Sequence, residues 1–369
     1  MSLNCGIVGL PNVGKSTLFK AVTSAPAEAA NYPFCTIEPN VGIVNVGDER
    51  LKKISDIINP ERVVPTIVEF VDIAGLVKGA SKGEGLGNQF LGHVRQVNAI
   101  IHVVRCFDDA DVVHVNGKVD PIDDVSTINL ELAFADLEVV EKKIQAIPKM
   151  IKSHNKEISL NAKALVPVLD KLKEELENGK PARLIGLSDD DKDLIKDLNL
   201  ITLKKMLYLC NVDEEGLSED NDYVKKVFEI ANSEGAEAMK ICGKLESEIS
   251  LLDTDEEKAE FMEAVGIEES GLSILTKRAY HMLGYRTYFT AGVKEVRAWT
   301  FKEGATAPEA AGVIHTDFQK GFIKAETFHC DDLFQFGSEA KVKENGKLRI
   351  EGKEYIVKDG DVMHFKFNV

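Results

Sequence analysis

The chain has 369 residues, of which 44% are hydrophobic and 29% charged, a composition typical of a globular protein with two or three domains. Its formal net charge of −16 argues against a protein that coats nucleic acid with its whole surface. No signal peptide fits ahead of the first strand, and no apolar stretch is long enough to span a membrane. The six cysteines are scattered, which predicts buried thiols in a cytoplasmic protein.

A glycine-rich segment lies close to the N-terminus. Residues 9–16 read GLPNVGKS, and they connect an apolar run at residues 5–8 to a helix-forming segment. Such a loop turns its backbone N–H groups toward phosphate oxygens, while Lys15 supplies a charge near the β and γ phosphates and Ser16 a hydroxyl for Mg²⁺. The motif therefore predicts binding of a nucleoside triphosphate by Asn12, Val13, Gly14, Lys15, Ser16 and Thr17.

The following part of the chain alternates between strands and helices. Short β-branched runs at residues 41–46, 67–71 and 100–104 are typical of parallel strands buried on both faces. Residues 48–58 and 88–98, which lie between these strands, have the apolar periodicity of helices.

The same alternation returns later, with strands expected at residues 206–210 and 238–242. We therefore predict an α/β fold in which residues 1–128 and 200–282 form a P-loop nucleotide-binding domain.

Residues 129–199 interrupt this domain with apolar side chains spaced by three and four, which predicts an inserted helical hairpin. Pro148 and Pro167 are expected to end or kink its helices. Residues 142–163 carry six lysines and the single acid Glu157. This basic face is a candidate contact for the phosphate backbone of RNA, and the alternative is an ordinary solvated helix face.

Residues 283–369 have a different sequence pattern, which is typical of short strands and turns, and they carry 13 basic and 13 acidic side chains. The pattern predicts a small α+β domain after the nucleotide-binding domain.

Two further segments complete the predicted phosphate site. The strand at residues 67–71 ends in the sequence DIAG, where Asp72 would hold Mg²⁺ through water and the N–H of Gly75 would sense the γ-phosphate. Thr36 precedes the second strand and is a candidate Mg²⁺ ligand when triphosphate is bound. The alternative is that Thr36 is a structural loop residue.

The predicted base site departs from that of ordinary GTPases, which carry Asn-Lys-x-Asp after the corresponding strand. Here residues 211–214 read NVDE, so Glu214 stands where the guanine-binding aspartate belongs. A misplaced acceptor weakens discrimination by hydrogen bonds, so Asn211 and Glu214 predict a site that admits ATP. The alternative is that Asn211 and Asp213 merely form a turn.

Together with residues 32–40 (YPFCTIEPN) and 79–87 (GASKGEGLG), these motifs resemble those of the YchF family of Obg-like ATPases. Residues 288–292 (YFTAG) and 315–318 (HTDF) resemble the C-terminal TGS module of that family, a β-grasp fold. The resemblance covers essentially the whole chain. It implies a G domain with an inserted helical hairpin, a preference for ATP over GTP, and association with the ribosome.

The resemblance also bears on catalysis. Switch GTPases carry a water-orienting glutamine where this chain has Leu76, so another group, or a partner, has to orient the water. His114 is the candidate, and the alternative is a packed or surface histidine. Asn12 occupies a position where related proteins help to hold K⁺, which makes K⁺ a second candidate cofactor beside Mg²⁺.

Taken together, the sequence predicts a slow Mg²⁺-dependent ATPase that acts as a ribosome-associated switch, with Lys15 and Gly75 stabilising the reacting γ-phosphate. The expected ribosomal contacts are residues 142–163 and the C-terminal domain. Two alternatives remain, a GTPase translation factor in which Asn211 suffices for guanine and a binding adaptor whose nucleotide only stabilises the fold.

Overall fold

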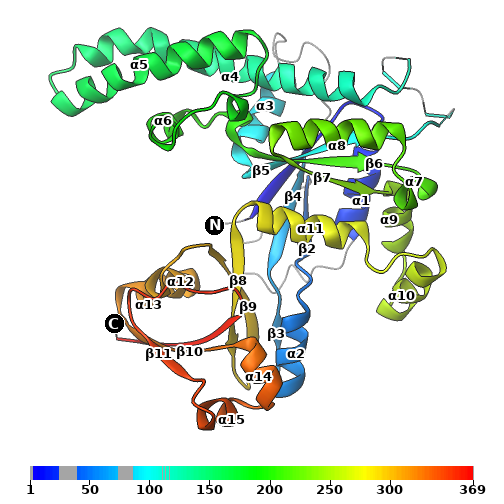
Figure 1. The fold of residues 1–369 in the computed structure, drawn as a ribbon, viewed down its shortest axis with the longest axis vertical. Coiled ribbons are helices and arrows are strands. Elements are labelled where there is room, and N and C mark those ends of the chain that lie inside the picture. Colours follow the sequence, from blue (N-terminus) through cyan, green and yellow to red (C-terminus); the bar gives the residue numbers. More distant parts are fainter. Residues whose placement is uncertain are drawn as a thin grey trace.

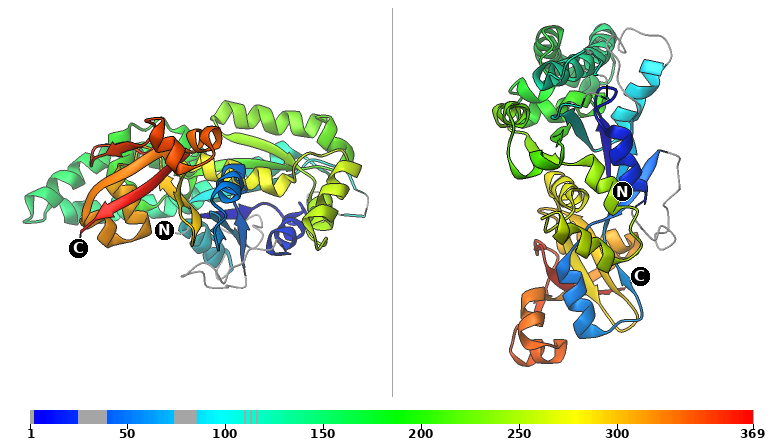
Figure 2. Two further views of the ribbon diagram at one scale, coloured as in Figure 1. Left: turned by 90° about the horizontal axis from the view of Figure 1, so that it is seen from below. Right: turned by 90° about the vertical axis from the view of Figure 1, so that its right-hand side faces the viewer.

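The computed structural model describes residues 3–24, 40–73, 86–109, 111–112, 114–115 and 117–368. Two six-stranded sheets form two lobes, and a pair of long helices extends from the first lobe on the side away from the second (Figure 1). The perpendicular views show the same three parts (Figure 2).

The first sheet has the strand order β2-β4-β1-β5-β6-β7. Its strands are β1 (Asn4–Val8), β2 (Val41–Asn45), β4 (Ile67–Asp72), β5 (Ala99–Arg105), β6 (Lys205–Asn211) and β7 (Glu237–Ile241). All neighbours pair in parallel except β2, which pairs antiparallel with β4 and lies at the edge of the sheet. The expectation of a parallel strand at residues 41–46 was therefore wrong, because a short apolar run does not reveal strand direction.

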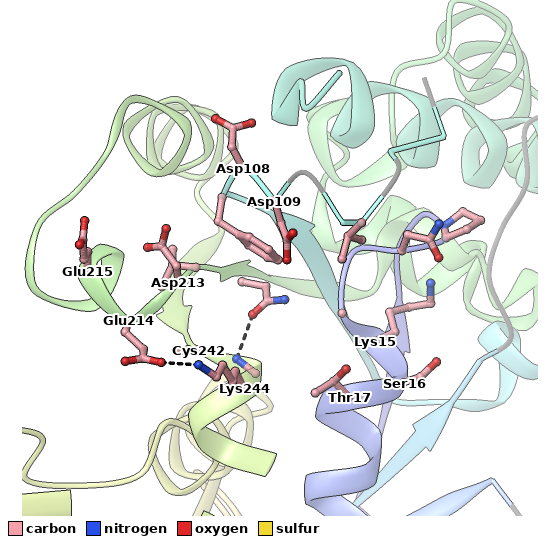
Figure 3. A pocket seen from close by; sticks show the side chains of 18 of the residues that line it. Lys15, Ser16, Thr17, Asp108, Asp109, Asp213, Glu214, Glu215, Cys242 and Lys244 are labelled. Carbon is pink, nitrogen blue, oxygen red and sulfur yellow. Dashed lines mark hydrogen bonds and ion pairs between the residues drawn. The ribbon is translucent and has the colours of Figure 1, made fainter. Parts of the chain in front are cut away.

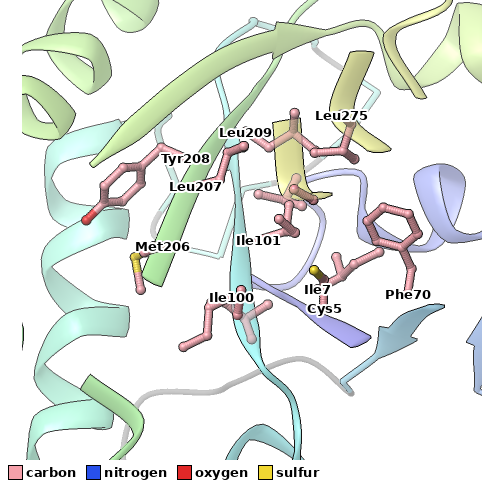
Figure 4. Packing of buried hydrophobic residues seen from close by; sticks show 14 of the residues in the cluster. Cys5, Ile7, Phe70, Ile100, Ile101, Met206, Leu207, Tyr208, Leu209 and Leu275 are labelled. Atoms are coloured by element: carbon pink, nitrogen blue, oxygen red, sulfur yellow. The ribbon is translucent and has the colours of Figure 1, made fainter. Parts of the chain in front are cut away.

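The core of this lobe surrounds β5, whose seven residues are all buried. Ile101 of β5 and Leu209 of β6 pack near Leu275 of α11, as Figure 4 shows. The helices of the first lobe are α1 (Lys15–Ser24), α3 (Leu86–Gln96), α7 (Glu214–Ser218), α8 (Asp222–Glu234), α9 (Gly243–Ile249), α10 (Asp255–Ala264) and α11 (Gly271–Met282). Packing on both faces holds the carboxyl ends of the strands at one edge, where ligands bind in parallel sheets.

The two long helices are α4 (Pro121–Ile151) and α5 (Lys156–Glu177). Helix α4 contributes to two cores, because Ile128 packs in the first lobe whereas Val140 and Ile147 pack against α5. The helix thus begins eight residues before the expected hairpin boundary at residue 129, and its first part belongs to the first lobe. Pro148 and Pro167 lie inside α4 and α5, so neither proline ends its helix.

The chain returns from α5 to the first sheet through short elements. These are η3 (Ala182–Leu184), α6 (Asp189–Leu194), η4 (Lys196–Leu198) and η5 (Ile201–Leu203). Ser188 and Asp191 form a capping box at the start of α6, so side-chain acceptors satisfy free N–H groups of its first turn.

The second sheet has the strand order β11-β10-β12-β8-β9-β3 and is mixed. Its strands are β3 (Val63–Val64), β8 (Tyr285–Ala291), β9 (Val296–Lys302), β10 (Phe322–His329), β11 (Arg349–Glu351) and β12 (Asp361–Phe367). The helices of this lobe are α2 (Glu49–Ile58), α12 (Ala307–Ile314), α13 (Thr316–Lys320), α14 (Cys330–Phe336) and α15 (Glu339–Glu344).

Helix α2 and strand β3 come from the N-terminal half of the chain but pack in the second lobe. Ile54 of α2 lies in one core with Phe289 and Phe328, and β3 pairs in parallel with β9. An ion pair of 2.7 Å between Arg50 and Asp359 joins the same parts. The predicted domain of residues 1–128 did not separate this segment, because the helical pattern of α2 does not say which sheet the helix covers.

Among the described residues, no helix combines the length and the apolar character needed to cross a membrane.

Candidate nucleotide-binding site

A cavity of about 1090 Å³ lies at the carboxyl ends of the strands of the first sheet. Its walls come from the segments that follow β1, β4, β5, β6 and β7, as expected for a ligand site of a parallel sheet. The lining residues are Pro11, Asn12, Gly14, Lys15, Ser16, Thr17, Asp72, Phe107, Asp108, Asp109, Val112, Asn211, Val212, Asp213, Glu214, Glu215, Cys242, Gly243 and Lys244. The structure thus brings together the predicted phosphate and base segments.

The glycine-rich loop has the backbone conformation that its sequence suggests. Gly14 has a φ of 99°, and a Cβ atom there would collide with Nδ2 of Asn211. Asn12 adopts a left-handed φ of 62°, which asparagine tolerates better than most residues. These conformations turn the chain sharply between β1 and α1.

Lys15 is held inside this loop and is only 8% exposed. Its Nζ atom donates hydrogen bonds to the carbonyl oxygens of Gly9 at 2.8 Å and Leu10 at 2.6 Å. These bonds use two of the three donors of the ammonium group, and Lys15 also lines the cavity. Burial lowers the pKa of Lys15 to about 8, against the opposing effect of the nearby Asp72 carboxylate.

Ser16 and Asp72 supply oxygen atoms to the same cavity, from the first turn of α1 and the end of β4. Burial raises the pKa of Asp72, whereas the charge of Lys15 lowers it. A hydroxyl and a carboxylate are suitable ligands for a hard divalent cation. The predicted partners Thr36 and Gly75 lie outside the described residues.

Asn211 joins the loops around the cavity. Its Nδ2 donates to the carbonyl oxygen of Val13 at 3.0 Å, and its Oδ1 accepts from the N–H of Gly243 at 3.0 Å. The amide therefore holds the glycine-rich loop against the start of α9. Both bonds are to backbone atoms, so the structure gives Asn211 a role in shaping the site.

The segment after Asn211 forms the far side of the cavity, away from Lys15 (Figure 3). Asp213 caps α7 by accepting a hydrogen bond from the N–H of Gly216 at 2.8 Å. Glu214 accepts a bond of 2.8 Å from Nζ of Lys244. This pairing occupies the carboxylate that stands at the position of the guanine-binding aspartate, and it raises the pKa of Lys244.

His114 does not line the cavity. Its Nε2 atom lies 3.0 Å from Oδ2 of Asp124 in the first turn of α4, and both side chains are only 2% exposed. Burial raises the pKa of Asp124, and the hydrogen bond with His114 lowers it. This packed position matches the alternative of a structural histidine for the state that the structure describes.

The sequence alone missed several residues of the site. Phe107, Asp108 and Asp109 line the cavity after β5, and Lys244 pairs with Glu214. The only sequence feature that could have indicated these residues is their place just after parallel strands, because such segments lie together at the carboxyl edge of the sheet. Arg105, the last residue of β5, was missed for the same reason.

Comparison with known proteins agrees with this geometry. A family model described as a 50S ribosome-binding GTPase matches residues 4–143, and a model of the C-terminal region of YchF GTPases, described as a protein of unknown function, matches residues 285–368. The parallel sheet, the glycine-rich loop and the buried Lys15 thus belong to a nucleotide hydrolase with a P-loop GTPase domain.

Full-length relatives narrow this class to a family. The chain is 56% identical to a protein of Bacillus subtilis (strain 168) and 57% identical to one of Haemophilus influenzae, each named "Ribosome-binding ATPase YchF", with 100% of both chains covered. The solved structure of the Schizosaccharomyces pombe YchF GTPase matches with a TM-score of 0.87 and 40% identity, over 99% of this chain and 98% of that one. The chain belongs to the YchF family.

Proposed function

We propose that the protein is a ribosome-binding, metal-dependent ATPase whose nucleotide state alters a ribosome-facing surface. The observation that carries this proposal is that one cavity is lined by the buried Lys15, by Ser16 and Asp72, and on its far side by the segment that includes Glu214. The names of the relatives support the same activity. A lack of nucleotide binding by the purified protein would contradict the proposal.

The chemistry is attack of water on the γ-phosphate in line with the leaving oxygen. Lys15 and the backbone N–H groups of residues 12–17 bind the phosphates and stabilise the charge that develops on them. Ser16 and Asp72 would hold a divalent cation such as Mg²⁺, with Thr36 and Gly75 proposed to complete the site from outside the described residues. The cation would neutralise charge on the β and γ phosphates when it is bound.

ATP is the proposed nucleotide because the carboxylate of Glu214 is displaced by one methylene and paired with Lys244. The names of the relatives divide between ATPase and GTPase, so the choice of base needs a direct test. Equilibrium binding of fluorescent ATP and GTP analogues in the presence of Mg²⁺ provides it. We expect ATP to bind at least as tightly as GTP, and about a tenfold preference for GTP would support a GTPase instead.

Potassium is proposed as a second cation because Asn12, which lines the cavity, occupies the position where related proteins help to hold K⁺. Turnover should be higher in potassium chloride than in sodium chloride of equal concentration. Equal turnover in the two salts would remove K⁺ from the mechanism.

We propose that the exposed lysines near the tip of α4 and α5 contact ribosomal RNA. Lys149, Lys152 and Lys156 are exposed there, about as far from the cavity as the first lobe and its two long helices allow (Figure 1). Reversal of these three charges to glutamate should weaken co-sedimentation with ribosomes and flatten its dependence on salt.

A matched control reverses three exposed lysines elsewhere on the first lobe, Lys20, Lys225 and Lys226. Equal loss of ribosome binding in both variants would indicate a general charge effect and would contradict the proposed contact of α4 and α5 with ribosomal RNA. A Lys15→Ala variant that still binds ribosomes and still supports growth would favour an adaptor in which turnover is incidental.

The second lobe is proposed to be a TGS domain of the β-grasp type, with residues 283–369 as its main part. The first lobe would comprise residues 1–128 and 200–282, with residues 129–199 as an inserted helical hairpin. The packing of α2 and β3 against the second sheet would add residues 49–64 to the second unit. A cytoplasmic location is consistent with ribosome binding.

A further inference from the structure

We propose that Arg105 is a positioning residue that holds one wall of the nucleotide cavity and thereby sets nucleotide affinity and base selectivity. The inference deepens the proposed function and rests on binding of the nucleotide in this cavity. Arg105 is the last residue of β5, and the wall in question consists of the described residues 107–109 and 111–112 that follow it.

All three nitrogen atoms of the Arg105 guanidinium donate to this one segment. Nε donates to the carbonyl oxygen of Phe107 at 3.1 Å, one terminal nitrogen to that of Val112 at 2.8 Å, and the other to that of Asp109 at 3.2 Å. Three carbonyl groups from a stretch of six residues thus converge on one planar group. Only arginine has a rigid fork of donors that can make these bonds together.

The anchor is strong because the arginine side chain itself is buried. Arg105 is 1% exposed, and its guanidinium carbon lies 4.8 Å from the centre of the Phe107 ring. A hydrogen bond that involves a charged group is worth more than a neutral one, and more still where water is excluded.

The segment held by Arg105 forms part of the cavity lining through Phe107, Asp108, Asp109 and Val112. In Figure 3, Asp108 and Asp109 lie across the cavity from Thr17 and Lys244. In the same view Asp108 and Asp109 lie between Lys15, at the proposed phosphate end, and Asp213 and Glu214, at the proposed base end. Side chains on this wall can contact a bound base only while their backbone stays in place.

Helix α8 provides a second, outer anchor for the same wall. Nδ2 of Asn221 donates to the carbonyl oxygen of Cys106 at 2.8 Å, and the hydroxyl of Tyr223 donates to the carboxylate of Asp108 at 3.1 Å. The Tyr223 bond is exposed, so its loss cannot unfold the lobe. It therefore offers a milder test of the same wall.

The experiment compares Arg105→Lys and Arg105→Met with the wild-type protein. Arg105→Lys keeps the charge but loses the fork, and Arg105→Met keeps much of the side-chain volume without donors. The measurements are equilibrium affinities for fluorescent ATP and GTP analogues, kcat and KM for ATP, and the thermal unfolding midpoint. Arg62→Met, on the second lobe, serves as the control for loss of a surface arginine.

We expect both Arg105 variants to bind the ATP analogue about tenfold more weakly and to show a changed ratio of ATP to GTP affinity. Because Arg105 is not among the residues that line the cavity, KM should rise while kcat at saturating ATP stays within about twofold. Tyr223→Phe should weaken binding in the same direction by about threefold.

Three outcomes separate the possibilities. If folded Arg105 variants bind both analogues as the wild type does, with only a lower unfolding midpoint, Arg105 is merely structural and the inference is wrong. If the Arg105 variants do not fold, unchanged affinities in Tyr223→Phe would overturn it. Wild-type protein that binds neither analogue would overturn the proposed function itself, and the inference with it.

Discussion

The side-chain amide of Asn211 lies directly against Gly14, and its Nδ2 donates a hydrogen bond of 3.0 Å to the carbonyl oxygen of the preceding residue, Val13. A Cβ atom at position 14 would collide with this amide, and the φ of 99° disfavours any side chain there. Gly14→Ala should therefore displace the loop and weaken binding of a fluorescent ATP analogue by about a hundredfold or more, as measured by titration.

The matched control is Gly92→Ala in α3, where an added Cβ would meet no atom within 4 Å. Alanine favours helices over glycine, so this variant should bind nucleotide normally and unfold at an equal or higher temperature. Normal binding by Gly14→Ala would show that the loop can accommodate the collision and that Gly14 is not required.

The pKa of Lys15 predicts how nucleotide binding depends on pH. Burial lowers this pKa to about 8 in the free protein, so the ammonium form is lost as the pH rises through that value. Phosphate groups favour the charged form and raise the pKa again. Affinity for ATP should therefore fall above about pH 8, and binding there should take up a proton.

Calorimetric titrations in buffers of different ionisation enthalpy, at about pH 7 and about pH 9, would measure both effects. Lys15→Arg is the control, because a guanidinium stays charged over this range and its residual binding should not change with pH. Equal affinity of the wild type at the two pH values would mean that Lys15 does not titrate as its burial suggests.

Asp136 of α4 connects three elements of the first lobe. Its carboxylate accepts bonds from the backbone N–H of Ile201 at 2.9 Å and of Thr202 at 2.7 Å, and from Arg95 of α3 at 3.2 Å. Asp136→Asn keeps the shape but turns an NH₂ group toward some of these donors. We expect a loss of about 2 to 4 kcal/mol in the free energy of unfolding, measured in urea.

Asp170→Asn on the exposed surface of α5 is the control and should change stability by less than about 0.5 kcal/mol. Helix α3 is the first described helix after Asp72, so its bond to α4 also joins the phosphate side of the lobe to the long helices. A stability of Asp136→Asn equal to that of the wild type would show that this junction is held by apolar packing alone.

Local patterns were enough to predict the parts of the site whose chemistry depends on residues adjacent in the chain. The glycine-rich loop, with Lys15 and Ser16, needs one turn between a strand and a helix, and its residues fall in the cavity as expected. Asp72 and Glu214 follow the same rule, since each ends or follows a parallel strand. The alternation of strands and helices likewise predicted most of the first sheet.

Contacts between distant segments could not be predicted in this way. The edge strand β2 runs antiparallel to its neighbour, and α2 covers the second sheet, although both have ordinary local patterns. The bonds of Arg105 to the carbonyl groups of Phe107, Asp109 and Val112 depend on where a loop returns after leaving the strand. The pairing of His114 with Asp124 depends on the start of α4, which lies earlier than its apolar pattern suggested.

That pairing leads to a test of how water is activated. His114 is bonded to Asp124 and does not line the cavity, so it can orient water only after it leaves the carboxylate. Asp124→Asn removes the charge that holds the imidazole and should raise kcat for ATP about threefold, whereas His114→Ala should lower it by about tenfold or more. The double variant should match His114→Ala, because Asp124 acts through the histidine. Steady-state phosphate release by the three variants, at saturating ATP and with nucleotide affinity checked separately, measures these effects. Turnover of His114→Ala equal to that of the wild type would make the pair a structural contact and leave water activation to another group or to a partner.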